Sequence, residues 1–436
     1  TGNVLAVAQS RPMGRSESAG ETFLNYAVPT RFGDSAGFQA GSTFKPFVLA
    51  AAVNQHIPLN TTFNAPQSMT LQQDEFANCQ GQPGFVGEWP VSSSTTSGPM
   101  DIYRGTRESV NTFYAMLERV TGVCEPFQIA KALGVELTDP KGDAHGYGAE
   151  RVPTFTLGIA NASPLEMAEA YATFGGRGVH CDSRPVTAIE DSNGTVIQEY
   201  PSRCTQALPE STADAVNDVL RGVQEPGGFG YDLGGTGLRV PSAGKTGTTQ
   251  DGKSVWFVGY TPQVATAAMI AGASKNGQRP IPLAGQTIHG NYIYSVSGSG
   301  FAGPMWAQAM HVVDDHLDYE DFVAPSQTQV EGVSTVVPTT SGMSVDQAIS
   351  TLKAAGFNAI EGGTAASANP AGTVAYTSPA GGSYAPKGSV VTVYESTGVP
   401  PPPPPGKGGH GGGNGGGTGG GGGPGGGNGH GNGGGR

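Results

Sequence analysis

Hydrophobic and polar positions along the first part of the chain follow two periods, which predicts a domain that mixes helices and strands. Alternating or continuous apolar runs predict strands at Asn3–Ala8, Ser254–Tyr260 and Val264–Ala271. A Thr-Pro turn separates the last two runs and predicts a hairpin. Apolar residues at helical spacing predict helices at Ser163–Phe174 and Gly303–Leu317, each with a proline in its first turn.

A second, smaller unit follows this domain. Ser344 and Gln347 have the spacing of a capping box, and the helix that they open is expected to end at Gly356. Two β-rich runs come next, at Thr373–Thr377 and Ser389–Tyr394. One helix with a few strands over about 60 residues predicts a compact α+β module.

These patterns divide the chain into a domain at residues 1–320, a linker at 321–333, a module at 334–397 and a tail at 398–436. The tail is rich in proline and glycine and has almost no apolar side chains to bury, so we expect it to be disordered. Within the first domain, residues 71–100 are rich in Gly, Ser, Thr and Pro and predict a long surface excursion.

Composition and charge exclude several classes of protein. The net charge of −12 argues against a nucleic-acid binder, which needs a basic face to neutralise phosphates. The chain contains no run of about 18 apolar residues, so no membrane span is predicted. Thr1 opens directly into a turn and an expected strand, so we expect a fragment whose export signal or membrane anchor lies upstream. No Cys-x-x-Cys or His-Glu-x-x-His pattern occurs, and we expect no metal and no cofactor in the chemistry.

Three short motifs carry the candidate chemistry, and their order makes them specific. Ser42 and Lys45 form a Ser-x-x-Lys pattern, Ser109 and Asn111 a Ser-x-Asn pattern, and Lys245 opens a Lys-Thr-Gly sequence. Each pattern alone is weak evidence, since the serines at 242 and 350 also begin Ser-x-x-Lys. Among the three serines that begin Ser-x-x-Lys, only Ser42 is followed first by a Ser-x-Asn pattern and then by Lys-Thr-Gly. A phosphate-binding loop at the lysine of the third motif is excluded, because an arginine stands where its first glycine is required.

At this point the chain resembles the penicillin-recognising serine enzymes, and most closely the transpeptidase domain of class A penicillin-binding proteins. The resemblance covers most of residues 1–318 and rests on the stretches "GSTFKPFVLAAA", "RESVNTFYAMLERVTGV", "TFTLGIANASPLEMAEAYATFGGRG" and "SAGKTGTTQDGKSVWFVGYTP". One departure is Ser254, where many relatives carry an aspartate. The smaller module is similar to a PASTA domain, an arrangement typical of actinobacterial examples. The implied fold is the α/β (α+β) transpeptidase fold shared by penicillin-binding proteins and β-lactamases.

The resemblance assigns a role to each motif residue. Ser42 is the nucleophile and Lys45 its base, while Ser109 relays protons between Lys45, Lys245 and the leaving amine. Asn111 holds the substrate amide, and Thr246, Gly247 and Thr248 bind the substrate beside Lys245. The backbone N–H groups of Ser42 and Thr248 form the oxyanion hole.

The local sequence around the first motif fits these roles. Pro46 is tolerated only in a first turn, which predicts a helix that begins near Ser42. Ser42 and Lys45, three residues apart, then lie on one face of the helix. Lys45 precedes the proline and is expected to adopt a locally disfavoured helical conformation. Its pKa must fall for it to act as a base, and burial by neighbouring phenylalanines and the charge of Lys245 both favour that.

The implied reaction is D,D-transpeptidation. The enzyme releases D-alanine from a peptidoglycan stem peptide, on lipid-linked precursor or nascent glycan strands, and cross-links the acyl group to a neighbouring amine. β-Lactams are expected to acylate the nucleophile. The expected setting is the extracytoplasmic face of the cell membrane, in the C-terminal part of a bifunctional glycosyltransferase/transpeptidase. Alternatives are a D,D-carboxypeptidase, a serine β-lactamase, a β-lactam sensor and a cell-wall-binding protein without turnover.

Two further expectations follow from this setting. An extracytoplasmic protein with an even number of cysteines predicts disulfides, and we expect Cys79–Cys124 and Cys181–Cys204. The second pair flanks an expected hairpin that turns at Asn193-Gly194. The Glu-x-x-Leu-Asn motif of class A β-lactamases does not occur between the second and third motifs. The glutamates at 166 and 169 are interpreted as solvated helix charges.

Overall fold

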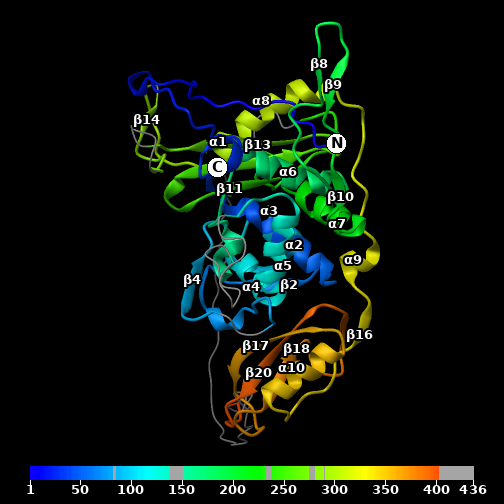
Figure 1. The fold of residues 1–436 in the computed structure, drawn as a ribbon. Coiled ribbons are helices and arrows are strands. Elements are labelled where there is room, and N and C mark those ends of the chain that lie inside the picture. The colour runs from blue at the N-terminus through cyan, green and yellow to red at the C-terminus, as the bar shows by residue number, and fades with distance from the viewer. Residues whose placement is uncertain (82–84, 138–150, 232–236, 274–279, 289, 402–436) are drawn as a thin grey trace, which may run out of the picture.

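The computed structural model describes residues 1–81, 85–137, 151–231, 237–273, 280–288 and 290–401. A three-stranded antiparallel sheet forms the upper part of the first domain (Figure 1), in the order β11 (Ala243–Thr248), β12 (Ser254–Tyr260), β13 (Ala265–Ala271). The predicted hairpin of the last two strands is confirmed. β11 lies at one edge of this sheet, and no further strand of the described residues pairs with its outer side.

Helices cover both faces of this sheet, so every residue of the central strand is buried. α6 (Pro164–Gly175) and α7 (Glu210–Arg221) pack on one face and share a core with Trp256. α8 (Gly303–Asp314) packs on the other face, where its Trp306 contacts Phe257. Alternate residues of one strand thus enter two separate cores, as strand geometry requires. The predicted helices at 163–174 and 303–317 are confirmed, although the second ends three residues early.

A helical layer lies between this sheet and the C-terminal module (Figure 1). At its centre is α2 (Lys45–Asn54), of which the residues from Lys45 to Val53 are all buried. A helix that is buried all round belongs to a protein core. The 3₁₀ helix η2 (Gly41–Phe44) leads directly into it. Around it lie α3 (Ile102–Arg107), α4 (Asn111–Thr121), α5 (Cys124–Ala132) and the 3₁₀ helix η4 (Pro153–Leu157).

Residues 71–100 differ from the predicted surface excursion because they contribute to the core. They form most of two antiparallel strand pairs, in which buried Phe76 and Trp89 contact each other. Apolar side chains in a Gly- and Ser-rich segment are enough to fold it back onto the domain. The strands are β2 (Thr62–Ala65) with β5 (Gly98–Asp101), and β3 (Ser68–Gln72) with β4 (Glu88–Ser92).

The predicted strand at Asn3–Ala8 is wrong. Only Asn3 makes a β-bridge, to Arg184, and the following residues pair with no strand in the described part of the chain. Leu5 is 74% exposed, so the alternation of this segment does not correspond to a buried face. An apolar pattern predicts a strand only where a partner supplies the backbone hydrogen bonds.

Both predicted disulfides are present. Cys79 bonds to Cys124 at the start of α5. Cys181 and Cys204 face each other across the antiparallel pair β7 (Val179–Cys181) and β10 (Cys204–Gln206). Between these strands lies the expected hairpin of β8 (Ala188–Glu190) and β9 (Val196–Glu199), which turns at Asn193-Gly194.

The C-terminal module has its own small core. α10 (Val345–Ala354) begins at the predicted Ser344–Gln347 capping box and packs on a three-stranded sheet. The sheet runs β17 (Asn358–Ala365), β20 (Val390–Ser396), β18 (Val374–Ser378), with the first pair parallel and the second antiparallel. β16 (Ser334–Val336) pairs with β19 (Tyr384–Pro386) beside it.

The segment expected as a linker contains structure and contacts the first domain. It holds α9 (Gln327–Glu331), which is capped by Ser326. In this helix the carbonyl oxygens of Gln329 and Val330 accept hydrogen bonds from the backbone N–H groups of Leu59 and Asn60. Val390 of the module packs against the core of the first domain. A connection that makes these contacts holds the two parts together instead of acting as a free tether. The greater part of the expected disordered tail lies outside the described residues.

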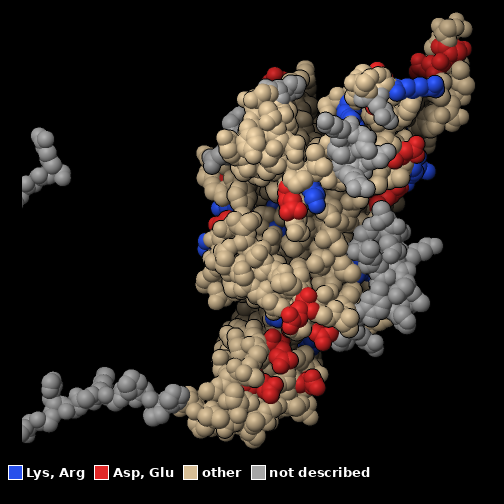
Figure 2. Space-filling view, turned by 90° about the vertical axis from the view of Figure 1, so that its left-hand side faces the viewer, with Lys and Arg blue, Asp and Glu red and all other residues tan. Residues whose placement is uncertain are grey.

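The remaining elements of the first domain are short. Among the described residues, no helix is long and apolar enough to cross a membrane. On the face in Figure 2, the described Lys and Arg side chains are scattered, and acidic side chains gather around the C-terminal module. The short elements are α1 (Thr30–Gly33), β1 (Phe38–Gln39), β6 (Asn161–Ala162), β14 (Thr287–Ile288), β15 (Asn291–Tyr292) and the turns of helix at 17–19, 73–75, 250–252 and 298–302.

The disulfides predict two losses of stability of different size. Replacing both Cys79 and Cys124 by serine should lower the free energy of unfolding by about 4 kcal/mol, because their 45-residue separation leaves a long loop free in the unfolded chain. The Cys181/Cys204 double variant, with a separation of 23, should lose about 0.6 kcal/mol less. Urea denaturation of both variants measures this difference. Equal losses in the two variants, both below the typical range of about 2–4 kcal/mol, would contradict the entropic explanation.

Candidate active site

The first motif lies where η2 passes into α2. Ser42 is the second residue of η2 and is half-buried, and Lys45 is the first residue of α2 with no exposed surface. Pro46 follows in the first turn, as the sequence predicts. Lys45 has φ −52° and ψ −37°, which is the helical conformation that a residue before proline resists. The expected conflict between the local preference and the observed conformation is therefore present.

The second motif supplies a serine held in an unusual backbone conformation. Ser109 lies between α3 and α4 and has φ +52°, in the left-handed region that residues other than glycine rarely adopt. Its carbonyl oxygen accepts a hydrogen bond from Lys45 Nζ at 2.7 Å, and its Oγ lies 3.1 Å from the same nitrogen. The conformation thus turns both oxygens of one residue towards one lysine.

The third motif brings a second lysine to the same hydroxyl. Lys245 on β11 has no exposed surface, and its Nζ lies 2.7 Å from Ser109 Oγ and 3.1 Å from the carbonyl oxygen of Thr246. The Ser109 hydroxyl therefore sits between two amines. A proton can pass from one amine to the other through this single oxygen.

Burial sets the protonation of both lysines. Burial lowers the pKa of Lys45 well below its usual value, and the nearby positive charge of Lys245 lowers it further. Burial also lowers the pKa of Lys245, to about 7. Two ammonium groups that share one hydroxyl in a dry environment repel each other, so the site favours at least one neutral amine near neutral pH.

Asn111 and Tyr114 complete the surroundings of Lys45. The Oδ1 atom of Asn111 accepts a hydrogen bond from Lys45 Nζ at 2.8 Å, while its Nδ2 donates to the carbonyl of Ser92 at 3.1 Å. The ring of Tyr114 lies 5.4 Å from the same Nζ. Sequence reasoning missed this tyrosine, although its position three residues after Asn111 on α4 places both on one helix face.

Glycines let the first and third motifs approach each other closely. A Cβ atom on Gly247 would lie 2.5 Å from the carbonyl oxygen of Ala40, and one on Gly158 would lie 2.0 Å from that of Gly41. Gly41 in turn donates its N–H to the carbonyl of Gly158 at 3.1 Å. Gly247, predicted as a substrate-binding residue, is thus also required by the packing of η2 against β11.

The two threonines of the third motif differ in exposure. Thr246 is almost buried, and its Oγ1 lies 3.5 Å from Lys245 Nζ. Thr248 is exposed, and its Oγ1 accepts a hydrogen bond from the backbone of Gly298 at 3.1 Å. The structure therefore joins Lys45, Ser109, Asn111, Lys245 and Thr246 through direct contacts. Ser42 lies one helical turn before the first lysine, and Gly247 and Thr248 continue the third motif along β11.

A pocket of about 260 Å³ lies next to the end of β11 and was not predicted. Ser254, the departure from the relatives' aspartate, lies in its wall and donates from its Oγ to the carbonyl of Gln39 at 2.7 Å. Trp256 Nε1 donates to the same carbonyl at 2.8 Å. The serine thus braces the segment that leads into η2 against β12. The lining residues are Gly37, Phe38, Gln39, Asn161, Thr249, Lys253, Ser254 and Pro280.

Comparison with known families agrees with this fold and site. The family model described as the penicillin binding protein transpeptidase domain matches residues 1–291, and the PASTA domain model matches residues 335–397. The chain belongs to the penicillin-binding protein transpeptidase family. The predicted resemblance of both parts is confirmed.

Several similar proteins carry the name penicillin-binding protein 1A. The chain is 30% identical over 303 residues to that of Aquifex aeolicus, covering 68% of this chain and 36% of the relative. It is 29% identical over 320 residues to that of Mycobacterium tuberculosis, covering 69% and 35%. The chain therefore spans about a third of the length of these relatives.

Solved structures give the same result. The penicillin-binding protein PonA1 from Mycobacterium tuberculosis is similar with a TM-score of 0.55 and 25% identity, covering 72% of this chain and 78% of that chain. The structure of PonA1 in complex with penicillin V is similar with a TM-score of 0.52 and 26% identity, covering 70% and 74%. The predicted transpeptidase fold is confirmed.

The coupling between the lysines predicts a shift in pH dependence. The rate of acylation by penicillin should fall as pH drops through the lowered pKa of Lys45, because a protonated amine cannot accept the serine proton. Lys245→Gln removes the positive charge that lowers this pKa, so the acidic limb should move to higher pH. Stopped-flow acylation rates between about pH 5 and 10 measure the limb.

Lys253→Gln is the matched control for this experiment. Lys253 is partly exposed in the connection between β11 and β12 and pairs with Asp251 at 3.5 Å. The substitution removes one positive charge but leaves both buried lysines in place. The acidic limb of the acylation rate should therefore lie at the same pH as in the unsubstituted protein. An unmoved limb in Lys245→Gln, or an equal movement in both variants, would refute the coupling.

Proposed function

We propose that the first domain is a D,D-transpeptidase that transfers an acyl group from a peptidoglycan stem peptide to an amine through an ester on Ser42. One observation carries the proposal: the Ser109 hydroxyl lies between Nζ of Lys45 and Nζ of Lys245, at 3.1 and 2.7 Å. This arrangement supplies a base next to a serine nucleophile and a path for its proton. The membership of the transpeptidase family supports the same reaction.

Acylation begins with neutral Lys45, which accepts the proton of the Ser42 hydroxyl. The serine oxygen bonds to the carbonyl carbon of the penultimate D-alanine, and the bond from that carbon to the nitrogen of the terminal D-alanine breaks. The leaving nitrogen receives a proton from the Ser109 hydroxyl, which is refilled from protonated Lys45. Lys245 holds Ser109 Oγ in place at 2.7 Å during this transfer. The proposed steps use only these side chains and the backbone.

Deacylation uses the same groups in reverse. The amine of a neighbouring stem peptide bonds to the ester carbonyl carbon, and its proton returns along the lysine–serine path to the departing Ser42 oxygen. The product is a peptide cross-link. Backbone N–H groups of Ser42 and Thr248 serve as the oxyanion hole, where each donor is worth about 3 kcal/mol in transition-state stabilisation.

The edge of β11 binds the extended substrate. In this proposal Asn111, which contacts Lys45, also holds the substrate amide, and the hydroxyls of Thr246 and Thr248 bind the terminal carboxylate of the substrate beside Lys245. A strand at the edge of a sheet suits a peptide because it offers a row of backbone hydrogen-bonding groups. Gly247 has no side chain to block the approach of this edge to η2, which carries the nucleophile.

The wider setting of the domain is also part of the proposal. Relatives that are penicillin-binding proteins 1A extend well beyond the region that the chain matches. We place the domain on the extracytoplasmic face of the membrane, in a bifunctional glycosyltransferase/transpeptidase anchored upstream. Two disulfides fit an oxidising compartment. Peptidoglycan strands are the proposed partner, and β-lactams are proposed covalent inhibitors.

A hydrolytic enzyme with the same motifs is the second candidate, and the position of Glu166 disfavours it. Glu166 is buried, so its interpretation as a solvated helix charge is wrong. Its carboxylate completes the capping box with Ser163 and accepts the N–H of Glu136 at 2.8 Å. A carboxylate committed to a helix start is not available to activate water at the ester.

Mass spectrometry of the penicillin-treated protein tests the nucleophile. The unsubstituted chain should gain one penicillin mass, and Ser42→Ala should gain none, because only Ser42 has both partner motifs. Ser350→Ala is the matched control: Ser350 also begins a Ser-x-x-Lys sequence, on α10, and its variant should be acylated like the unsubstituted chain. An adduct that persists in Ser42→Ala would end the proposal.

The lifetime of the adduct separates transpeptidase from β-lactamase. Without a placed base, attack by water lacks a contribution of about 10²–10⁴-fold. The penicilloyl ester should therefore persist for many minutes to hours. Intact-mass spectrometry after removal of free drug measures this lifetime. Steady release of hydrolysed penicillin at several turnovers per second would favour the β-lactamase alternative.

A further inference from the structure

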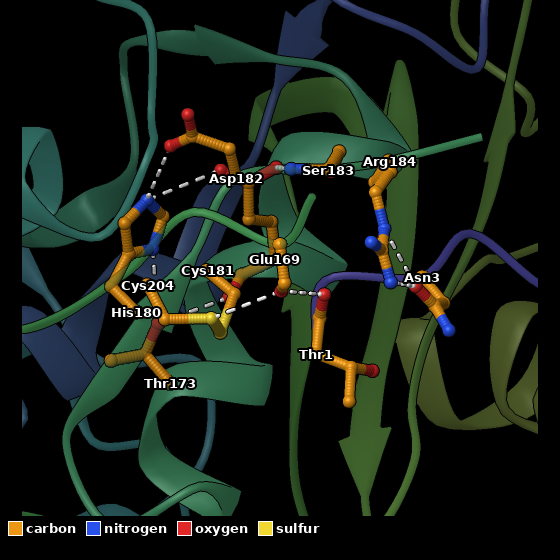
Figure 3. Close-up of a disulfide and its surroundings, with 11 residues drawn as sticks. Thr1, Asn3, Glu169, Thr173, His180, Cys181, Asp182, Ser183, Arg184 and Cys204 are labelled. Carbon is orange, nitrogen blue, oxygen red and sulfur yellow. Dashed lines mark hydrogen bonds and ion pairs between the residues drawn. A yellow bond between two sulfur atoms is a disulfide. The ribbon is translucent and has the colours of Figure 1, made fainter. Parts of the chain in front are cut away.

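Three potential metal ligands meet beside the second disulfide, far along the chain from the motifs. Glu169 lies on α6, His180 on β7, and Asp182 follows β7 directly (Figure 3). Residues 180 and 182 share one face of the strand because side chains alternate. Cys181 lies between them and bonds to Cys204 on the neighbouring strand. A strand that is fixed to its neighbour by a disulfide thus presents two ligands to one helix.

We propose that Glu169, His180 and Asp182 form a binding site for one divalent transition-metal cation, of which Zn²⁺ fits best. The site lies outside the proposed reaction and does not depend on it. From the sequence alone no metal is expected, and Glu169 is interpreted as a solvated charge. In the structure the Glu169 side chain is only 15% exposed.

The distances between the ligand atoms favour a cation. His180 Nε2 lies 3.4 Å from Glu169 Oε1 and 3.7 Å from Asp182 Oδ1. Both distances exceed the usual 2.7–3.2 Å of an N–H···O hydrogen bond. The edges of a tetrahedron around zinc are about 3.3–3.6 Å for bonds of 2.0–2.2 Å, so the first distance lies within this range and the second just above it. All three ligand atoms lie within 4.8 Å of one another.

The other polar atom of each ligand already has a partner. Glu169 Oε2 accepts hydrogen bonds from the backbone N–H of Ser183 at 3.0 Å and from its hydroxyl. Asp182 Oδ2 pairs with Arg203 at 3.0 Å. Such outer partners orient ligands in metal sites and leave one atom of each free to bind. Here the free atoms are the three that face one another.

The tautomer of His180 follows from its outer partner. Nδ1 lies 3.3 Å from the Oγ1 atom of Thr173, which itself donates to the carbonyl of Glu169 at 3.2 Å. The threonine hydrogen is therefore in use, and its oxygen accepts from Nδ1–H. The lone pair of Nε2 then points at two carboxylates, an arrangement that a cation between them stabilises.

The choice of zinc follows from the ligand types and from access. Imidazole with carboxylates suits Zn²⁺ better than Mg²⁺ or Ca²⁺, which prefer oxygen ligands alone. The Asp182 side chain is 50% exposed, so a metal ion can enter and a water molecule can complete the tetrahedron. A bound ion would fasten the disulfide-linked strands to α6, which packs on the central sheet.

Isothermal titration calorimetry of the full chain, treated with EDTA and titrated with zinc chloride, tests the site. The unsubstituted protein should bind one Zn²⁺, and zinc should raise its melting temperature. Asp182→Asn and Glu169→Gln should weaken binding by at least the 10–100-fold typical of losing an outer partner. Both should still be acylated by penicillin, which shows that they fold.

His311→Asn is the matched control, because His311 is an exposed histidine on α8 with no carboxylate cluster around it in the described structure. This variant should bind zinc like the unsubstituted protein. Absence of binding to the unsubstituted chain would overturn the proposal. Zinc binding by Asp182→Asn and Glu169→Gln that is as tight as in the unsubstituted protein would also overturn it, since the metal would then lie elsewhere.

Discussion

Two lysines buried against one serine hydroxyl impose the electrostatic constraint on which the active site depends. Burying an unpaired charge is costly, and the partners of Lys45 and Lys245 are carbonyl, amide and hydroxyl oxygens of Ser109, Asn111 and Thr246. Among the described residues no carboxylate pairs with either lysine. A carboxylate would stabilise the ammonium form and raise the pKa. Neutral acceptors keep the amine available as a base while satisfying its hydrogen bonds.

The backbone around the site is shaped to maintain this contact. Ser109 adopts a left-handed conformation and Lys45 a helical one before proline, and both are disfavoured locally. Gly158 allows a backbone approach that a side chain would block. These features persist because α2 is buried all round and the sheet is covered on both faces, so the surrounding core determines the conformation. Local sequence preference is overridden where the chemistry needs it.

Those parts of the site that sequence order encodes could be predicted without the structure. The three motifs, the helix start at Pro46 and the Cys181–Cys204 pair each follow from spacing along the chain. Tyr114 and the bracing of Gln39 by Ser254 were missed because they depend on contacts between segments distant in sequence. The strand expected at Asn3–Ala8 failed for the same reason, since a strand needs a partner that periodicity does not supply. The cluster at Glu169 joins two elements without any motif.

The protonation state of Lys45 is the central claim, and lysine NMR measures it directly. Lysine labelled with ¹³C at Cε and ¹⁵N at Nζ would be followed through a pH titration, with the Lys45→Arg variant used to assign the resonance. We expect Lys45 to titrate well below the exposed lysines, because burial and then the charge of Lys245 lower its pKa. Titration together with the exposed lysines, near the unperturbed value of about 10.4, would contradict its role as the base.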